Sequence, residues 1–357
     1  MPGTVAWLRA AHGRRALFWA GAGVCLLAGL FLLSLSKGAV TLPPKTLLHS
    51  FGRLIEEGSL PDTREALILV NIRLPRTLLA MLVGAALAVS GALLQGLFRN
   101  PLADPGLIGV SAGAALAAGL TIVFGDVLLA PVLGKLPFAV LPAGAFVGGL
   151  VSTLMLYAIA TRGGRTSIAT MLLAGVALGA LSGAISGFLA YLSDDRQLRD
   201  LTFWALGSFS GASWAKLLAV APAMIAALLL APFLARGLDA LALGEAEAYH
   251  LGLPVQRVKA AAILIAAGAV GASVAVAGMI GFVGIVVPHV LRMLLGASHR
   301  LLLPFSALGG ALLLLGADLV ARLVIAPAEL PIGILSAAIG APFFLWVLLG
   351  RQARFFE

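Results

Sequence analysis

Long apolar runs separated by short polar segments set the strongest limit on how this chain can fold. Each run is roughly 20 residues long or longer, the length that an α-helix needs to cross a bilayer. The chain of 357 residues is 61% hydrophobic and only 11% charged, a balance that soluble domains do not have. The ten runs are 16–36, 74–98, 106–124, 137–160, 167–192, 215–235, 255–277, 279–296, 302–325 and 331–350. We therefore expect an all-α integral membrane protein, a single domain over residues 1–357 with ten transmembrane helices.

An even number of crossings places both termini on one side of the membrane, and the basic residues indicate that this side is the cytoplasm. Lys and Arg occupy short loops on that side, whereas the external ones gather in one long segment, 37–76. The first run follows Arg9, Arg14 and Arg15 as in a signal peptide, but its apolar core is too long, so we interpret it as a retained span. The formal net charge of +9 is explained by Lys and Arg that flank the spans and meet anionic lipid. We therefore predict contact with membrane lipid and not with nucleic acid.

Two segments of the chain, 84–105 and 309–331, resemble each other. The aligned pairs are Gly84 with Gly309, Gly91 with Gly316, Pro101 with Pro327 and Pro105 with Pro331, the prolines after a slip of one residue. The copies lie seven spans apart, an odd number, so they point in opposite directions through the membrane. We therefore predict an inverted repeat that relates helices 2–5 to helices 7–10, an arrangement typical of transporters.

A short charged segment, 243–254, lies between two apolar spans that carry almost no charge. Its sequence, LGEAEAYHLGLP, predicts a short helix from Glu245 to Leu253 on the cytoplasmic side, within a loop of about 239–254. A structured polar helix at that place favours a docking surface for a cytoplasmic partner. The chain has no phosphate-binding loop, no HExxH and no CxxC, so we predict no cofactor, no metal site and no enzymatic activity of its own.

Two further segments have a structural and a functional interpretation. Gly175, Gly179, Gly183 and Gly187 recur at every fourth residue and form one smooth stripe along a helix. The stripe indicates either tight helix packing or the wall of a wide substrate pathway, and both are compatible with a subunit interface. The turn at 99–106 is either a plain connector or a constriction with Asn100 and Leu102 pointing into the pathway.

Charged residues near the external ends of the spans also leave alternatives open. Asp318 and Arg322 share one face of a helix, as an internal ion pair or as part of a pathway. Arg73 and Arg76 flank Pro75, either as anchors at the membrane interface or, with Arg322, as a basic patch for an acidic partner. His289 follows a proline, and we favour a hydrogen-bonded structural histidine over a metal or haem-iron ligand.

Taken together, these motifs resemble the permease subunits of ABC importers for iron-siderophores, haem and cobalamin, the FecCD type, over residues 65–350. The matching motifs are I-R-L-P-R-T at 72–77, S-G-A-x-x-Q-x-x-x-x-N-P-L-A-x-P-G at 90–106, L-L-A-G-V-A-L-G at 172–179, A-L-G-E at 242–245, L-G-L-P at 251–254, G-F-V-G-I-V-V-P-H-x-x-R at 281–292, H-R-x-L-L-P at 299–304, A-D-x-x-A-R at 317–322 and E-L-P-I-G at 329–333. The resemblance implies the type II importer fold, a homodimer in the bacterial inner membrane, two cytoplasmic ATPase subunits that bind ATP and Mg, and a periplasmic binding protein.

The resemblance also implies roles for individual residues. Coupling to the ATPase is expected at Glu245, Ala246, Ala248, Leu251 and Gly252. Docking of the binding protein is expected at Arg73, Arg76 and Arg322. The cytoplasmic gate is expected at Asn100, Leu102, Thr166 and Ser167, although 162–170 departs from the family pattern. The pathway is expected along Gly175, Gly179 and Gly183.

These features predict ATP-driven import by alternating access, with haem as the first choice of substrate and cobalamin or a ferric siderophore as alternatives. An ion-coupled secondary transporter needs a polar site at mid-membrane, and only Asp318 qualifies, next to Arg322. A membrane haem or redox enzyme needs paired axial ligands, and most of the five histidines fall outside the spans: His12, His49, His250, His289 and His299.

Overall fold

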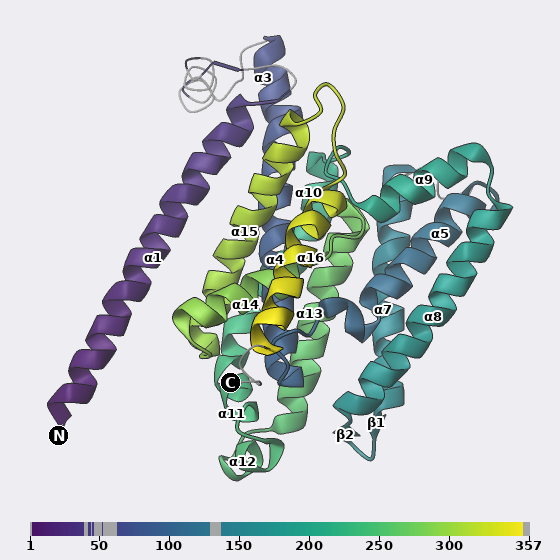
Figure 1. Cartoon of the computed structure of the whole chain (residues 1–357). Helices are drawn as coiled ribbons and strands as arrows, with labels where there is room; N and C mark the ends of the chain where they lie inside the picture. Colours follow the sequence, from purple (N-terminus) through teal and green to yellow (C-terminus); the bar gives the residue numbers. More distant parts are fainter. Residues whose placement is uncertain are drawn as a thin grey trace.

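The computed structural model of the chain describes residues 2–38, 63–128 and 137–352, together with residues 42, 43, 45 and 52. Nearly all of the described segments are helical (Figure 1). The first half contains α1 (Pro2–Ser36), α3 (Arg64–Ile68), the π-helix η1 (Leu69–Arg73), α4 (Leu74–Phe98), the 3-10 helix η2 (Pro105–Ile108), α5 (Val110–Leu128), α7 (Pro137–Ala160), β1 (Thr161–Arg162), β2 (Arg165–Thr166) and α8 (Ile168–Leu192). The second half contains α9 (Asp195–Leu206), α10 (Trp214–Leu230), the 3-10 helix η3 (Ala231–Leu234), α11 (Ala235–Leu241), α12 (Glu245–His250), α13 (Val255–Ala277), α14 (Val283–Leu295), α15 (His299–Leu323) and α16 (Ile332–Gln352).

Each of the ten predicted apolar runs coincides with a described helix, which confirms the all-α membrane fold. Seven of the described helical segments are long and apolar enough to cross a membrane, and the apolar parts of α5, α14 and α16 are shorter. With 13 residues, α14 extends only about 20 Å, less than the hydrocarbon core of about 30 Å. The number of ten complete crossings therefore stays a prediction.

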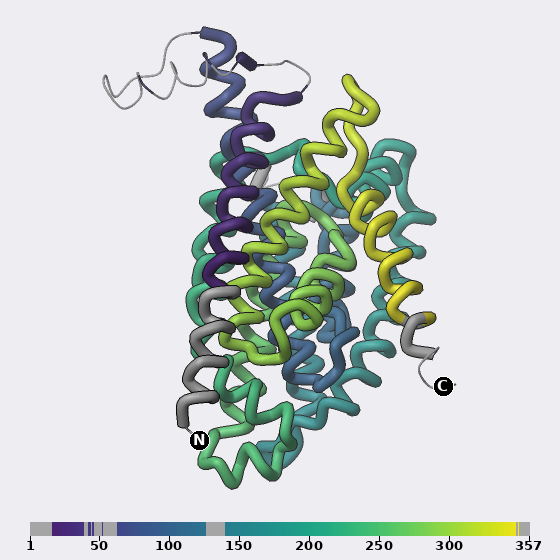
Figure 2. The backbone as a smooth tube through the Cα atoms, turned by 60° about the vertical axis from the view of Figure 1, so that its left-hand side comes forward, coloured from purple at the N-terminus to yellow at the C-terminus, as the bar shows by residue number. Residues whose placement is uncertain are grey.

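The helices form a bundle with two distinct ends (Figure 1). One end carries α3 and α9 and is called the α9 end here. The opposite end carries α12 and the β1–β2 hairpin and is called the α12 end. The last turns of α1 lie toward the α9 end, as does the start of α16. The tube in Figure 2 shows α1 running along the outside of the bundle.

Helices α4 and α15 approach to backbone distance at Gly84 and Gly310. A Cβ added to Gly84 would lie 2.1 Å from the carbonyl oxygen of Gly310, and one added to Gly310 would lie 2.1 Å from that of Gly84. Arg76, eight residues before Gly84, binds Asp318, eight residues after Gly310, so the two helices are antiparallel. This direction agrees with the predicted inverted repeat, although Gly84 faces Gly310 rather than its aligned partner Gly309.

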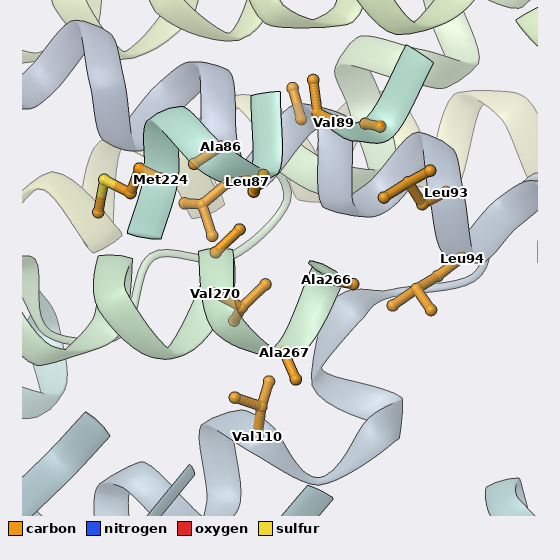
Figure 3. Packing of buried hydrophobic residues seen from close by; sticks show 14 of the residues in the cluster. Ala86, Leu87, Val89, Leu93, Leu94, Val110, Met224, Ala266, Ala267 and Val270 are labelled. Atoms are coloured by element: carbon orange, nitrogen blue, oxygen red, sulfur yellow. The ribbon is translucent and has the colours of Figure 1, made fainter. Parts of the chain in front are cut away.

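The core is built around α4 and α13, which are surrounded by other helices. In the most apolar stretch of 64–98, 83% of the residues are buried, and the value for α13 is 72%. Figure 3 shows how Leu87 and Val89 of α4, Val110 of α5, Met224 of α10 and Val270 of α13 gather there. By contrast, only 11% of the apolar stretch of α8 is buried, so this helix lies at the edge of the bundle with apolar side chains exposed.

A short hairpin is the exception to the helical fold, and the sequence analysis did not predict it. Thr161 pairs with Thr166, and Arg162 pairs with Arg165. The two residues between the strands, Gly163 and Gly164, have φ of 55° and 73°. Two successive positive φ angles match the two-residue turn that suits the twist of a hairpin, and glycine adopts them without strain. The Gly-Gly pair was the available signal.

Helix α9 is a second element for which the sequence analysis made no prediction. It begins with a capping box: the Asp194 carboxylate accepts a hydrogen bond from the N–H of Gln197, and the Gln197 side chain accepts one from the N–H of Asp194. An Asp followed three residues later by Gln was therefore a start signal. The Gln197 amide also donates to the Val123 carbonyl on α5 at 3.1 Å, which fixes α9 on the bundle.

The Gly84 contact gives a prediction about stability. We expect Gly84→Val to destabilise the protein by about 1–3 kcal/mol, because the added atoms must push α4 away from α15. Gly316→Val, on the same helix as Gly310, is the matched control, since a Cβ at Gly316 meets no atom within 4 Å. The measurement is the unfolding temperature of both variants in detergent. Equal unfolding temperatures would contradict the close contact.

Candidate functional site

A buried ion cluster joins three segments at the α9 end. Arg76 on α4 donates to Asp318 on α15 through Nε and Nη2, at 3.0 and 2.8 Å to Oδ1. Its Nη1 donates to both oxygens of Glu329, at 2.8 and 2.9 Å. Asp318 is fully buried, and it also pairs with Arg322 one turn along α15 at 3.0 Å. This confirms the ion pair that the spacing of Asp318 and Arg322 predicted, and bidentate geometry of this kind is strong and directional.

The same cluster holds the end of α1. Arg322 donates to the Ser34 carbonyl and hydroxyl at 3.3 and 2.7 Å, and Arg73 donates to the Leu35 carbonyl at 2.5 Å. These carbonyls belong to the last turn of α1, where they lack partners within the helix and favour cations. Arg73 ends the π-helix η1, which lies just before Pro75, whose ring crowds the carbonyl four residues earlier.

The three arginines predicted to dock a binding protein are therefore buried in the isolated chain. Arg73, Arg76 and Arg322 are only 5%, 6% and 6% exposed. Glu329, with 34% of its side chain exposed, is the part of the cluster that reaches solvent. The docking role stays a prediction, and an acidic partner would have to compete with Asp318 and Glu329 for the guanidinium groups.

Helix α12 projects from the opposite end and has well-defined limits. It ends at His250, earlier than predicted, because Gly252 adopts φ of 77° and closes the helix. The N–H of Leu253 donates to the Ala248 carbonyl and the N–H of Gly252 donates to the Tyr249 carbonyl, the pair of bonds of a Schellman motif. A glycine at this place avoids the cost of a left-handed conformation.

The predicted coupling residues divide into buried and exposed sets. Ala248 is fully buried and anchors α12 on the bundle, whereas Ala246, Leu251 and Gly252 are exposed. Leu243, Tyr249 and Leu251 are 69%, 73% and 64% exposed, an apolar surface at the tip of the α12 end. Exposed apolar groups on a rigid element indicate a docking surface for another protein.

Lys259 on α13 is a functional candidate that the sequence analysis missed. Its Nζ lies 2.6 Å from Oε1 of Glu245 at the start of α12 and donates to the Thr166 carbonyl at 2.9 Å. The N–H of Thr166 donates to Oε1 of Gln256, also on α13, at 3.0 Å. Ser167 follows and caps α8 by accepting a bond from the N–H of Thr170 at 3.2 Å. A lone lysine in the first turns of an apolar span was the available signal.

The predicted turn at 99–106, which holds the first gate candidates, Asn100 and Leu102, connects α4 to η2 and α5. Arg99 closes α4 with φ of 50°, unusual for a residue with a side chain. Asn100 Oδ1 accepts a bond from the N–H of Leu102 at 3.0 Å, and Asp104 accepts one from the N–H of Gly106 at 2.6 Å. Burial raises the pKa of the Asp104 carboxyl, and the bond from Gly106 opposes this rise. In the described part of the chain, no hydrogen bond joins Asn100 or Leu102 to Thr166 or Ser167, so their role as one gate stays a prediction.

The glycines of the predicted stripe on α8 differ in whether they contact the rest of the chain. A Cβ on Gly175 would lie 2.4 Å from the Leu107 carbonyl, so this glycine allows η2 to pack against α8. A Cβ on Gly179, Gly183 or Gly187 would meet no atom within 4 Å. These three glycines therefore line a face of α8 that is open within one chain, available to a second copy or to a pathway.

The histidines and acidic residues are the side chains that could hold a metal ion. His289 is buried and its ring lies 6.0 Å from that of Phe343 in an edge-on arrangement. Across the described ranges, no three His, Cys, Asp or Glu side chains gather as a metal site would require. His49 and the side chain of His12 lie outside the described residues, and the expected absence of a metal stays a prediction.

The FecCD transport family matches residues 26–350, which include both ends of the bundle described above. The chain belongs to this family. The hemin transport system permease protein HmuU of Yersinia pestis is 47% identical over 331 residues, covering 92% of this chain and 94% of the relative. The vitamin B12 import system permease protein BtuC of Klebsiella pneumoniae is 41% identical and covers 98% of both chains. The cobalamin permease BtuC of Halobacterium salinarum is 42% identical over 88% of this chain and 81% of its own length.

A solved structure supports the same assignment at the level of the fold. It is described as an inward-facing conformation of a metal-chelate type ABC transporter. It is 33% identical, covers 92% of this chain and 98% of its own, and superimposes with a TM-score of 0.79. This FecCD-family protein is therefore a membrane-embedded transport permease.

The ion cluster of this permease predicts a large effect at one residue. We expect Asp318→Asn to lower the free energy of unfolding by about 3–5 kcal/mol, because Arg322 and part of Arg76 lose their buried counter-charge. Asp200→Asn, at an exposed position on α9, is the matched control.

The measurement is unfolding in detergent, followed by fluorescence. The double variant Asp318→Asn with Arg322→Met should recover part of the loss, because it removes one uncompensated cation. If Asp318→Asn were as stable as the Asp200→Asn control, the cluster would not hold the α9 end together.

Proposed function

We propose that this chain is the membrane permease of an ATP-driven importer that carries haem from the periplasm to the cytoplasm by alternating access. The choice of haem as the substrate rests on the 47% identity with a hemin permease over 92% of this chain. Cobalamin is the second candidate, favoured by the permeases at 41% and 42% identity, and a ferric siderophore is the third. The protein lies in the bacterial inner membrane with both termini in the cytoplasm.

Hydrolysis of ATP is assigned to a separate pair of cytoplasmic ATPase subunits, which bind ATP and Mg. The support is the short helix α12 with the residues beside it, where Leu243, Tyr249 and Leu251 are exposed at the end of the bundle. These side chains suit an apolar cleft on the ATPase, with Ala246 and Gly252 beside them. This permease binds no cofactor of its own in the proposal.

A second copy of this chain is proposed to pack against the open face of α8. Large apolar residues on that helix, Leu173, Val176 and Leu181, are 73%, 67% and 57% exposed. The open stripe of Gly179, Gly183 and Gly187 lies on the same helix. Such a homodimer would enclose a pathway of small side chains along α8, with Asn100, Leu102, Thr166 and Ser167 as its cytoplasmic gate.

A periplasmic binding protein is proposed to deliver the substrate at the α9 end. Arg73, Arg76 and Arg322 are the residues that would meet its acidic groups, with Glu329 as the part that is displaced first. This requires opening of the cluster, because each of these arginines is bound to a group of this chain. Docking would then also loosen α1, whose last carbonyls the cluster holds.

An ion-coupled secondary transporter remains the alternative from another class. It would use Asp318 as the ion-binding carboxylate. Asp318 is fully buried and is bound by both Arg76 and Arg322, so a proton or metal ion would have to displace two cations. The ion cluster therefore favours the ATP-driven mechanism.

The proposed function is tested by transport in proteoliposomes that contain this chain with its ATPase and binding protein. We expect ATP-dependent uptake of haem, with little uptake when ATP is replaced by a non-hydrolysable analogue. Cobalamin and a ferric siderophore are measured in parallel under the same conditions. Uptake of cobalamin in preference to haem would change the substrate, and uptake driven by an ion gradient without ATP would overturn the importer class.

A further inference from the structure

Lys259 is the one buried lysine or arginine of the α12 end among the residues that the structure describes. It is only 2% exposed, and it is the fifth residue of α13. Its ammonium group contacts two different segments, the Glu245 carboxylate of α12 and the Thr166 carbonyl of the β1–β2 hairpin. Lysine is almost never fully buried unless it is paired, so this position requires an explanation.

The contacts of Lys259 connect α12 to the start of α8. Thr166 is held through both of its backbone polar groups, by Lys259 at the carbonyl and by Gln256 at the N–H. Ser167, the next residue, caps the N-terminus of α8. The side chain of Lys259 and the first turn of α8, the helix with the open glycine face, are therefore connected through the Thr166 peptide.

The two halves of this connection differ in exposure. The side chain of Glu245 is 42% exposed and sits at the first position of α12, beside the apolar docking surface. Thr166 is only 5% exposed. A partner can therefore reach Glu245 directly, whereas Thr166 is buried although the turn of the hairpin, Gly163 and Gly164, is exposed. In the part of the chain that is described, no other side-chain hydrogen bond or ion pair joins α12 to 161–167.

We infer that Lys259 is a positioning residue that transmits movement of α12 to the hairpin and to α8. This inference rests on the proposed function, in which an ATPase moves α12. The covalent path from α12 through 251–254 moves α13, and the Lys259 ammonium adds the link from α13 and α12 to the segment that begins α8. Loss of the link leaves ATPase binding intact and lowers the transport obtained from each ATP hydrolysed.

The test uses the complete reconstituted complex, and it measures ATP hydrolysis and haem uptake in the same vesicles. Lys259→Met removes the ammonium and fills most of its volume with an apolar chain, so no buried charge is left unpaired. We expect normal assembly with the ATPase and retained ATP hydrolysis, with uptake per ATP reduced by at least about tenfold, as expected for loss of one charge-assisted hydrogen bond.

Two further variants separate transmission from simple stability. Lys259→Arg keeps donors for both partners and should restore most of the uptake per ATP. Arg257→Met removes an exposed cation from the same turn of α13 and should behave as the wild-type protein. If Lys259→Met does not assemble, Glu245→Gln is the variant that tests the inference. It keeps an acceptor on α12 but weakens the bond to Lys259. We expect it to lose less uptake per ATP than the loss predicted for Lys259→Met.

The outcomes distinguish the inference from the proposed function. Wild-type vesicles that hydrolyse ATP and import substrate, with Lys259→Met or the deciding Glu245→Gln variant at the same uptake per ATP, would overturn the inference alone. Wild-type vesicles without ATP-dependent uptake of any tested chelate would overturn the proposed function, and the inference with it. A loss in Lys259→Met that Lys259→Arg reverses supports transmission through Lys259.

Discussion

The close antiparallel contact between α4 and α15 is the constraint on which the rest of the structure depends. Gly84 and Gly310 bring the two backbones together, and this contact sets the register of both helices. Toward one end the register places Arg76 opposite Asp318. Toward the other it places Gly96 against the ring of His299, which Asp239 of α11 holds at 2.7 Å. Small residues at one crossing therefore determine what meets at both ends of the permease.

Buried charge is concentrated at these two ends and is used differently at each. Among the described residues, Arg73, Arg76, Asp318 and Arg322 are buried at the α9 end, and Lys259 is buried at the α12 end. The α9 cluster is almost entirely internal, so it fastens α1, α4 and α15 to one another. Lys259 forms an ion pair with the partly exposed Glu245, so the environment of Lys259 changes when a partner moves α12. The first arrangement stabilises the helices against one another, whereas the second can transmit movement of α12 to the hairpin.

The sequence predicted the helices well because their signals are local. Apolar runs located every long helix, and the i,i+4 spacing located the pair of Asp318 with Arg322. The predicted end of α12 at Leu253 lies three residues beyond its observed end at His250. The hairpin and α9 also had local signals, in Gly163-Gly164 and in the capping box at Asp194, but these were given less weight than hydropathy.

Pairings between distant segments could not be predicted in the same way. Nothing near Arg76 indicates that Glu329 completes its contacts, and nothing near Lys259 indicates that it reaches the Thr166 carbonyl. Both depend on how α4, α13 and α15 pack, which one sequence does not specify directly. The exposure of the docking arginines was misjudged for the same reason, since their partners come from other helices.

Joint movement of α12 and the start of α8 is tested most directly by the distance between α12 and the hairpin during ATP turnover. Spin labels at His250 and Arg162, both exposed, report this distance once Cys25 is replaced by Ser. If Lys259 joins the two segments, the distance distribution should be the same with and without ATP in the assembled importer, and it should broaden in Lys259→Met. A shift of several ångströms on ATP binding in the otherwise native protein would contradict the claim that α12 and the start of α8 move together.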